Sequence, residues 1–120
     1  MMIKVLKSKI HRATVTDSLI DYPGSIGIDS ALMEATGILP YETVLVADVT
    51  NGNRLETYVV PEKAGSGKIT ILGAAAHLMK KGDIIIIMGF AYLTPDEAKN
   101  FKPKVVVADG KNGVKENLSF

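Results

Sequence analysis

The sequence contains no cysteine among its 120 residues. Disulfide bonds, zinc–thiolate sites and a cysteine nucleophile are therefore excluded. A chain without disulfides suits a reducing compartment, and we expect a cytoplasmic protein. With 47% hydrophobic residues, the chain is long enough to bury a sizeable core, so we expect a single domain over residues 1–120.

The chain also has little net charge. Lys and Arg number 14 and Asp and Glu number 13, which gives a formal net charge of +1. This balance creates no long-range field toward nucleic acid or an anionic membrane, so we expect neither as a partner. Any binding of anions must depend on a local group of cations.

No apolar run is long enough to span a bilayer. The longest, Ile84–Leu93, is short and rich in β-branched residues, which is typical of a buried strand. Near the N-terminus, Lys4, Lys7 and Lys9 interrupt the apolar residues, whereas an export signal has an unbroken apolar stretch. We therefore expect no export signal.

Short strands dominate the pattern that is present. Apolar, β-branched runs bounded by turn residues predict strands at residues 3–6, 13–16, 25–28, 43–49, 55–60, 68–72, 84–93 and 105–107. Asn51-Gly52 between two of these runs is a strong signal for a β-hairpin. The pattern predicts a mainly β fold, a small closed barrel with a few short helices. Because a small barrel often completes its burial by association, we expect a homo-oligomer.

Two of the expected helices have good capping residues. One helix is expected at residues 30–36, with Asp29 or Ser30 as its N-cap. Gly37 is well placed to end it. Another helix is expected to begin after Thr94, which starts a capping-box sequence.

Three further segments are predicted from local signals. Residues 74–81 form a candidate helix, and residues 110–120 have no periodicity and are expected to fray. Pro23-Gly24 favours a type II turn, in which the glycine takes a positive φ. Taken alone, Ser25 is then simply the residue after a turn.

Common catalytic motifs are missing. The Gly65–Lys68 segment lacks the first glycine of a P-loop and precedes a strand, so we expect a flexible loop there. His11 and His77 have no carboxylate at metal-ligand spacing, and no metal site is expected. Ser25 lacks the Gly-x-Ser-x-Gly pattern of a hydrolase elbow.

Several weak motifs nevertheless occur together in a specific order. They are Lys9–Ala13 (KIHRA), Tyr22–Ser25 (YPGS), Asn51–Arg54 (NGNR), Thr57-Tyr58 and Gly73–His77 (GAAAH). The ordered set closely resembles the bacterial aspartate 1-decarboxylase family, pyruvoyl-dependent enzymes that make β-alanine for pantothenate. The resemblance covers residues 1 to 109, and it implies a double-psi β-barrel and a homotetramer with active sites between subunits.

The resemblance implies that the chain makes its own cofactor. The Ser25 hydroxyl attacks the Gly24 carbonyl, and elimination and hydrolysis leave a pyruvoyl group in place of Ser25. The products are a β chain of residues 1–24 and an α chain of residues 25–120. The pyruvoyl group forms a Schiff base with L-aspartate and accepts electrons when CO₂ leaves.

The resemblance also assigns roles to other residues. Tyr58 matches the proton donor, and Thr57 matches a position that binds substrate and stabilises the cleavage oxyanion. Arg54 and Lys9 match the positions that bind the substrate carboxylates.

The remaining matches are less specific in their chemistry. Gly73, Ala74 and Ala75 match positions whose small side chains let backbone groups approach the substrate. His11 and Tyr22 match pocket positions.

Departures from the family pattern bear on processing and on substrate. Leu72 stands where the family usually has Asn, and Pro23 is uncommon before Gly-Ser, so both affect the expected self-cleavage. A maturation factor is one further partner to consider. Ala47 is small where some members have a large aromatic residue. Two alternatives stay open: a non-catalytic small β-barrel binding module, and a pyruvoyl decarboxylase acting on another acidic amino acid such as glutamate.

Overall fold

The computed structural model describes all of residues 1–120. It contains nine β-strands, two short α-helices and one 3-10 helix, η1. In chain order they are β1 (Ile3–Thr14), β2 (Asp17–Leu19), β3 (Ser25–Asp29), α1 (Ser30–Thr36), β4 (Thr43–Asp48), β5 (Arg54–Glu62), β6 (Ile69–Leu72), η1 (Gly73–His77), β7 (Ile84–Leu93), α2 (Pro95–Lys99), β8 (Lys104–Ala108) and β9 (Val114–Leu118).

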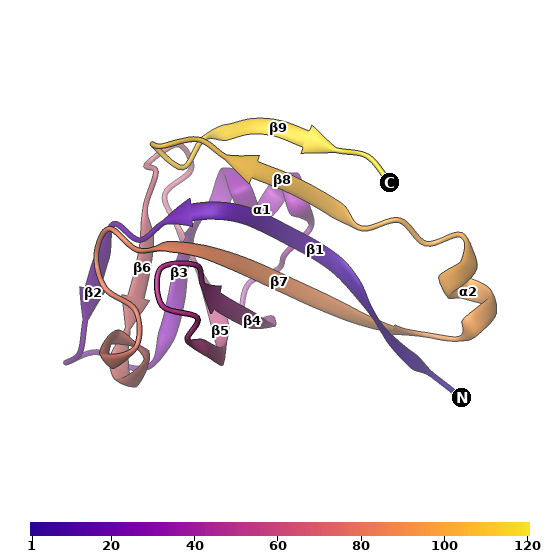
Figure 1. Cartoon of the computed structure of the whole chain (residues 1–120), viewed down its shortest axis with the longest axis horizontal. Helices are drawn as coiled ribbons and strands as arrows, with labels where there is room; N and C mark the ends of the chain where they lie inside the picture. Colours follow the sequence, from indigo (N-terminus) through magenta and orange to yellow (C-terminus); the bar gives the residue numbers. More distant parts are fainter.

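The strands form one strongly curved sheet in the order β2-β6-β3-β5-β4-β7-β1-β8-β9. Three pairs are parallel, namely β1 with β8, β2 with β6, and β3 with β5. Figure 1 shows β1, β7, β8 and β9 running along the longest axis, while β2, β3 and β6 cross them at one end. The expected mainly β, small barrel-like fold is confirmed.

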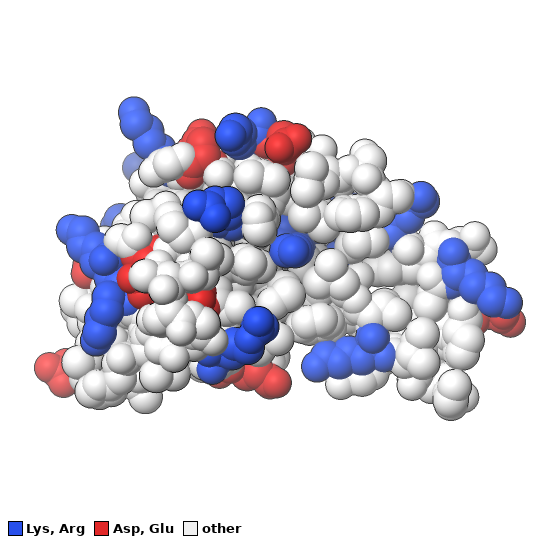
Figure 2. Space-filling view, in the orientation of Figure 1, with Lys and Arg blue, Asp and Glu red and all other residues white.

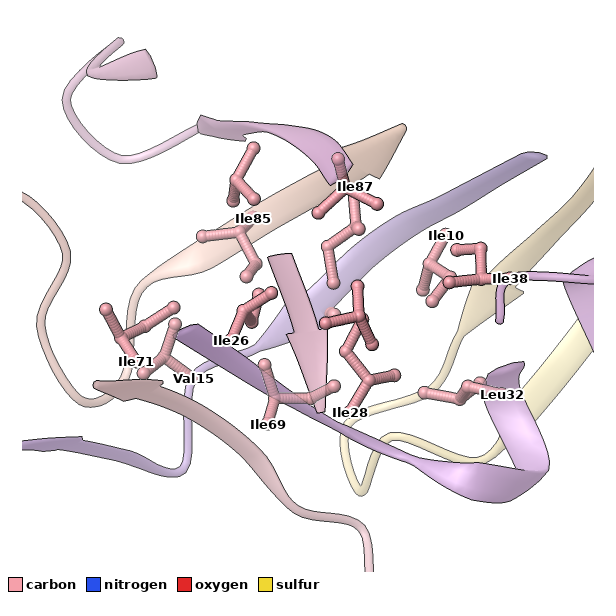
Figure 3. Packing of buried hydrophobic residues seen from close by; sticks show 14 of the residues in the cluster. Ile10, Val15, Ile26, Ile28, Leu32, Ile38, Ile69, Ile71, Ile85 and Ile87 are labelled. Atoms are coloured by element: carbon pink, nitrogen blue, oxygen red, sulfur yellow. The ribbon is translucent and has the colours of Figure 1, made fainter. Parts of the chain in front are cut away.

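Isoleucine fills the space enclosed by this sheet. A cluster of 19 buried residues includes Ile26 and Ile28 of β3, Ile85 and Ile87 of β7, and Ile10 of β1, none of which is exposed to solvent. Figure 3 shows these side chains pointing toward one another from several strands. β-Branched side chains pack well on pleated surfaces, so the same residues favour the strands and form the core.

Both predicted helix starts are confirmed. Asp29 is the N-cap of α1 and accepts a hydrogen bond from the backbone N–H of Ala31 at 2.9 Å, and Gly37 ends the helix in the left-handed region at φ 76°. Thr94 and Glu97 form the capping box of α2. These signals depend on neighbouring residues alone, which is why the sequence suffices to predict them.

The Gly65–Lys68 segment is a loop, as expected, but it is anchored. The buried Asp29 carboxylate accepts hydrogen bonds from the backbone N–H groups of Gly65 at 3.0 Å and Gly67 at 2.8 Å. These two amides point at a carboxylate of the same chain, an arrangement that ties the loop to the start of α1.

The helix predicted over residues 74–81 is wrong. Only the 3-10 helix Gly73–His77 forms, and the chain then turns so that Met79 is fully buried. Gly73 and Gly82, which lie at the two ends of the predicted helix, both have positive φ. Burial of Met79 therefore outweighs the helix propensity of the alanines.

Three other expectations are corrected. The C-terminal segment does not fray, because Val114–Leu118 pairs with the free edge of β8 as strand β9. Gly24 has no positive φ, so the type II turn at Pro23-Gly24 is wrong. The two strands predicted within residues 3–16 form one strand, β1, that contains two register shifts.

The helices of the structure are short. None has the length and apolarity that crossing a membrane would require.

Candidate active site

The Gly24-Ser25 peptide lies where the chain enters β3. Ser25 is the first residue of this strand and is buried, whereas Gly24 just before it is exposed. Ser25 pairs with Leu72, the last residue of β6, in the antiparallel register of the two strands. The peptide is therefore fixed on its C-terminal side and open to solvent on its N-terminal side.

Gly73 packs directly against this peptide. A Cβ atom at Gly73 would lie 2.7 Å from Gly24 Cα and 2.9 Å from the backbone oxygen of Tyr22. Gly73 also has a φ of 80°, a conformation that side chains rarely tolerate. Only glycine fits at residue 73, and its small size lets η1 approach Gly24.

Thr57 reaches the same place from β5. The parallel register of β3 and β5 pairs Ile26 with Val59, which brings Thr57 level with Gly24 two residues earlier. A pocket of about 300 Å³ is lined by Gly24, Leu55, Glu56, Thr57, Leu72, Ala74, Ala75 and Leu78. The structure thus brings together the predicted residues Gly24, Ser25, Thr57, Gly73, Ala74 and Ala75, which we call the cleavage-site group.

Tyr58 and Arg54 lie on the opposite face of β5 from Thr57. Successive side chains of a strand point to opposite faces, and along β5 the exposed residues Arg54, Glu56 and Tyr58 alternate with the less exposed Leu55 and Thr57. Tyr58 is 39% exposed, and its ring centroid is 6.5 Å from that of Tyr41. Neither Arg54 nor Tyr58 lines the pocket beside Gly24.

Lys9 belongs to this second face. It pairs with Met88 of β7, Met88 pairs with Leu45 of β4, and Leu45 pairs with Glu56 of β5. Paired residues share a face of the sheet, so Lys9 lies on the same face as Arg54 and Tyr58. We call Lys9, Arg54 and Tyr58 the outer-face group. Strands β7 and β4 separate its members, a spacing of roughly 14 Å between the β1 and β5 backbones.

The cations of the outer-face group have no carboxylate partners within the chain. The two ion pairs of the structure are Lys7–Glu42 and Lys99–Asp96, so Lys9 and Arg54 are both free to bind an anion. Figure 2 shows Lys and Arg in separate groups over one face, which agrees with a local rather than a global attraction for anions.

His11 and Tyr22 lie apart from the pocket beside Gly24. His11 is partly buried on β1, and its Nδ1 atom has no hydrogen-bond partner. Burial and, to a smaller extent, the charges of Lys9 and Arg12 lower the pKa of His11, so its imidazole is neutral at neutral pH. Tyr22 lines a different pocket of about 370 Å³, although its backbone oxygen lies near Gly73.

Sequence reasoning missed three residues of the pocket beside Gly24. Leu55 and Glu56 belong to the same strand as Thr57, and their place next to a predicted site residue was the available signal. Leu78 had no such signal, because the predicted helix placed it differently from the turn that the chain adopts.

The fold and the site together define a small, mainly β domain whose candidate site surrounds a Gly-Ser peptide at the start of a strand. The aspartate decarboxylase family model matches residues 1–115, and the chain belongs to this family. It is 53% identical over 120 residues to an aspartate 1-decarboxylase of Clostridium botulinum, covering 100% of this chain and 94% of the relative. It is 54% identical over 116 residues to that of Fervidobacterium nodosum, covering 97% and 98% of the two chains. It is 53% identical over 114 residues to that of Stenotrophomonas maltophilia, covering 95% and 90%.

Proposed function

We propose that this chain cleaves itself between Gly24 and Ser25 and then decarboxylates L-aspartate to β-alanine and CO₂. The observation that carries the proposal is the placement of this peptide. It lies against Gly73, beside a pocket that Thr57 and Ala74 line, in a member of the aspartate decarboxylase family. The product would supply β-alanine for pantothenate synthesis in the cytoplasm.

The proposed cleavage needs only Ser25, Gly24 and water. The Ser25 Oγ attacks the Gly24 carbonyl carbon, and the C–N bond breaks to give an ester and a free amine. Elimination then breaks the Cβ–Oγ bond and releases the Gly24 carboxylate. Hydrolysis of the remaining enamine releases ammonia and leaves a pyruvoyl group at residue 25. Gly24 has no side chain to obstruct the attack, and the nearest atom to an added Cβ there is 4.0 Å away.

The residues around Gly24 fit such a group. The backbone of Gly73 approaches closely, and the small side chains of Ala74 and Ala75 leave the pocket open. Once formed, the pyruvoyl carbonyl supplies an electrophile for the substrate amine and an acceptor for the electron pair left by CO₂. The Thr57 hydroxyl is the side-chain donor level with Gly24, and we assign it to the oxyanion of cleavage and to substrate binding.

The outer-face group supplies the other half of the site from a second copy of the chain. Arg54 and Lys9 have no partners in their own chain and lie on the sheet face opposite Thr57. Arg54 binds one aspartate carboxylate with two parallel hydrogen bonds, Lys9 adds a compact charge, and Tyr58 donates the proton that replaces CO₂. The proposal therefore includes a homo-oligomer, a tetramer by resemblance, with its sites between subunits.

An assay for β-alanine tests the activity. The purified chain, after heating or incubation with a candidate maturation factor, is expected to convert aspartate and to prefer it to glutamate. Ser25→Ala removes the attacking oxygen and is expected to abolish activity while the protein stays folded, since the change is small. Ser66→Ala, in the exposed loop before β6, is the matched control and is expected to retain activity. If the chain prefers glutamate, aspartate is not its main substrate. Activity in Ser25→Ala would refute the proposed origin of the pyruvoyl group from Ser25.

A further inference from the structure

A pair of acidic residues, Asp48 and Asp83, lies away from the Gly24-Ser25 peptide. Asp48 ends β4 and is 2% exposed. It pairs with Ile85 of β7, so the partly buried Asp83, two residues before Ile85, is its diagonal neighbour on the same face, within reach of its side chain. One Asp48 oxygen, Oδ1, accepts the backbone N–H of Thr50 at 2.8 Å. The other oxygen, Oδ2, is buried and receives no N–H or O–H donor from the rest of the chain.

Two adjacent carboxylates in such a place cannot both be ionised at low cost. An unpaired buried carboxylate oxygen loses its hydration without compensation, and a neighbouring negative charge adds repulsion. A proton held between the two carboxyl groups removes both problems, because it provides the donor that Asp48 Oδ2 lacks. Asp83 is the better acceptor, since its Oδ2 already receives the backbone N–H of Lys80 at 3.0 Å.

Asp48 controls the hairpin that carries Arg54. Its backbone N–H donates to the Asn53 oxygen at 2.8 Å, and its backbone oxygen accepts the N–H of Gly52 at 2.8 Å. Together with the bond from Thr50 to its side chain, these contacts fix both sides of the loop that leads into β5. The position of Arg54, the first residue of β5, therefore depends on Asp48.

Asp83 belongs to the segment that follows the cleavage-site residues Gly73, Ala74 and Ala75. Its backbone N–H and its side chain both bond Lys80, in the turn after Met79. The two segments also meet directly, because the side-chain amides of Asn51 and Asn53 donate to the Leu78 oxygen at 3.3 and 3.0 Å. The Asp48–Asp83 contact is thus one of several that join the Arg54 hairpin to residues 73–83.

We propose that Asp48 and Asp83 share one proton and act as a positioning pair, which holds the hairpin carrying Arg54 against the segment carrying Gly73–Ala75. The shared proton is inferred from the burial and the contacts of Asp48 and Asp83, and it does not depend on the proposed function. Its consequence for substrate binding rests on the proposed function, in which Arg54 binds an aspartate carboxylate.

The direction of the pH dependence follows from the neighbours of each carboxyl. Burial and then the Asp83 carboxyl raise the pKa of Asp48, while the N–H and hydroxyl of Thr50 oppose the rise. The hydrogen bond from Asp48, the Lys80 N–H and the Lys80 charge lower the pKa of Asp83. The native state therefore keeps a proton that the unfolded chain releases, so this contribution to stability is lost as pH rises through the raised pKa of Asp48. At the acid end, stability is lost as pH falls through the lowered pKa of Asp83.

Urea unfolding of the full chain between about pH 4 and pH 9 tests the shared proton, with the oligomeric state checked at each pH. This is roughly the range in which buried carboxyl groups with raised pKa values titrate. In Asp48→Asn the amide N–H donates to Asp83 at every pH, so its midpoint is expected to fall less with rising pH than that of the natural chain. Asp96→Asn removes the same charge from an exposed side chain and is the matched control, with a pH profile like that of the natural chain. Equal pH profiles for the natural chain and Asp48→Asn would overturn the shared proton.

A second measurement tests positioning. Asp48→Ala removes the side-chain contact between the hairpin and Asp83, while the bonds from Asn51 and Asn53 to the Leu78 oxygen remain. The KM for aspartate is expected to rise by about tenfold with a smaller change in kcat. Asp48→Asn is expected to recover most of this loss, because it restores the link without the shared proton. A KM in Asp48→Ala like that of the natural chain would overturn the positioning role. If the natural chain has no decarboxylase activity, the proposed function fails, while the unfolding profiles still decide whether the proton is shared.

Discussion

Thr57 and Tyr58 are adjacent in sequence, yet they face opposite sides of the sheet. Thr57 lines the pocket beside Gly24, whereas Tyr58 lies on the outer face with Arg54. Strand alternation imposes this separation, since any two consecutive strand residues point to opposite faces. Within one chain Thr57 lines the pocket beside Gly24 and Tyr58 does not, and under the proposed function the two side chains serve two different sites.

Tyr58→Phe isolates the proposed proton donor. The variant keeps the ring and loses only the hydroxyl, so we expect self-cleavage as in the natural chain. Turnover of aspartate is expected to fall by about 100-fold or more with little change in KM, the usual scale for loss of a general acid. Steady-state kinetics measure both constants.

Tyr41→Phe provides the control for this change. Tyr41 is 74% exposed and its ring lies 6.5 Å from that of Tyr58, so the variant removes a neighbouring hydroxyl from the same surface. Turnover in Tyr58→Phe no lower than in Tyr41→Phe would remove Tyr58 as the proton donor.

At the scale of elements, η1 and the segment before β3 make a close contact at the proposed cleavage site. Gly73 permits this contact in two ways: it adopts a positive φ, and it has no side chain. A Cβ atom added at Gly73 would lie only 2.7 Å from Gly24 Cα. The contact joins residues that are about fifty positions apart in sequence. The residues next to Gly24 and Gly73 do not predict this contact, because they carry only ordinary turn and helix signals.

Gly73→Ala tests this contact. Gly37→Ala is the matched control, because Gly37 has a similar φ of 76° but no atom within 4 Å of an added Cβ. Both variants pay the conformational cost, about 1–2 kcal/mol for a left-handed residue, and Gly73→Ala adds a clash with Gly24. We expect Gly73→Ala to lose more free energy of unfolding and to cleave more slowly, as measured by urea unfolding and gel analysis over time. Equal losses and equal cleavage rates in the two variants would show that the contact is unimportant.

Elements with local signals could be predicted from the sequence, and those that depend on distant partners could not. The caps at Asp29 and Thr94 and the hairpin at Asn51-Gly52 form as expected, because their hydrogen bonds involve close neighbours. The strand Val114–Leu118 has no apolar periodicity and forms because β8 offers a free edge. The alanine-rich segment after Gly73 is limited to a 3-10 helix by burial of Met79.

At the scale of the whole molecule, the candidate site consists of two halves on two faces. The family resemblance predicts the members of both halves by residue number, but their separation depends on strand register, which the sequence does not reveal. The series of paired residues from Lys9 through Met88 and Leu45 to Glu56 crosses four strands. It places the outer-face group away from Gly24. An association of copies that brings the outer face of one chain to the Gly24 pocket of another would complete the site.

The intact mass of the purified protein under denaturing conditions tests the central claim most directly. Self-cleavage predicts two pieces, residues 1–24 and residues 25–120, the larger one lighter by one ammonia than a chain that begins with serine. Ser25→Ala treated in the same way is expected to give one uncut chain. A natural chain that stays uncut after heating, and after incubation with any maturation factor, would contradict the pyruvoyl mechanism and favour a binding module without catalysis.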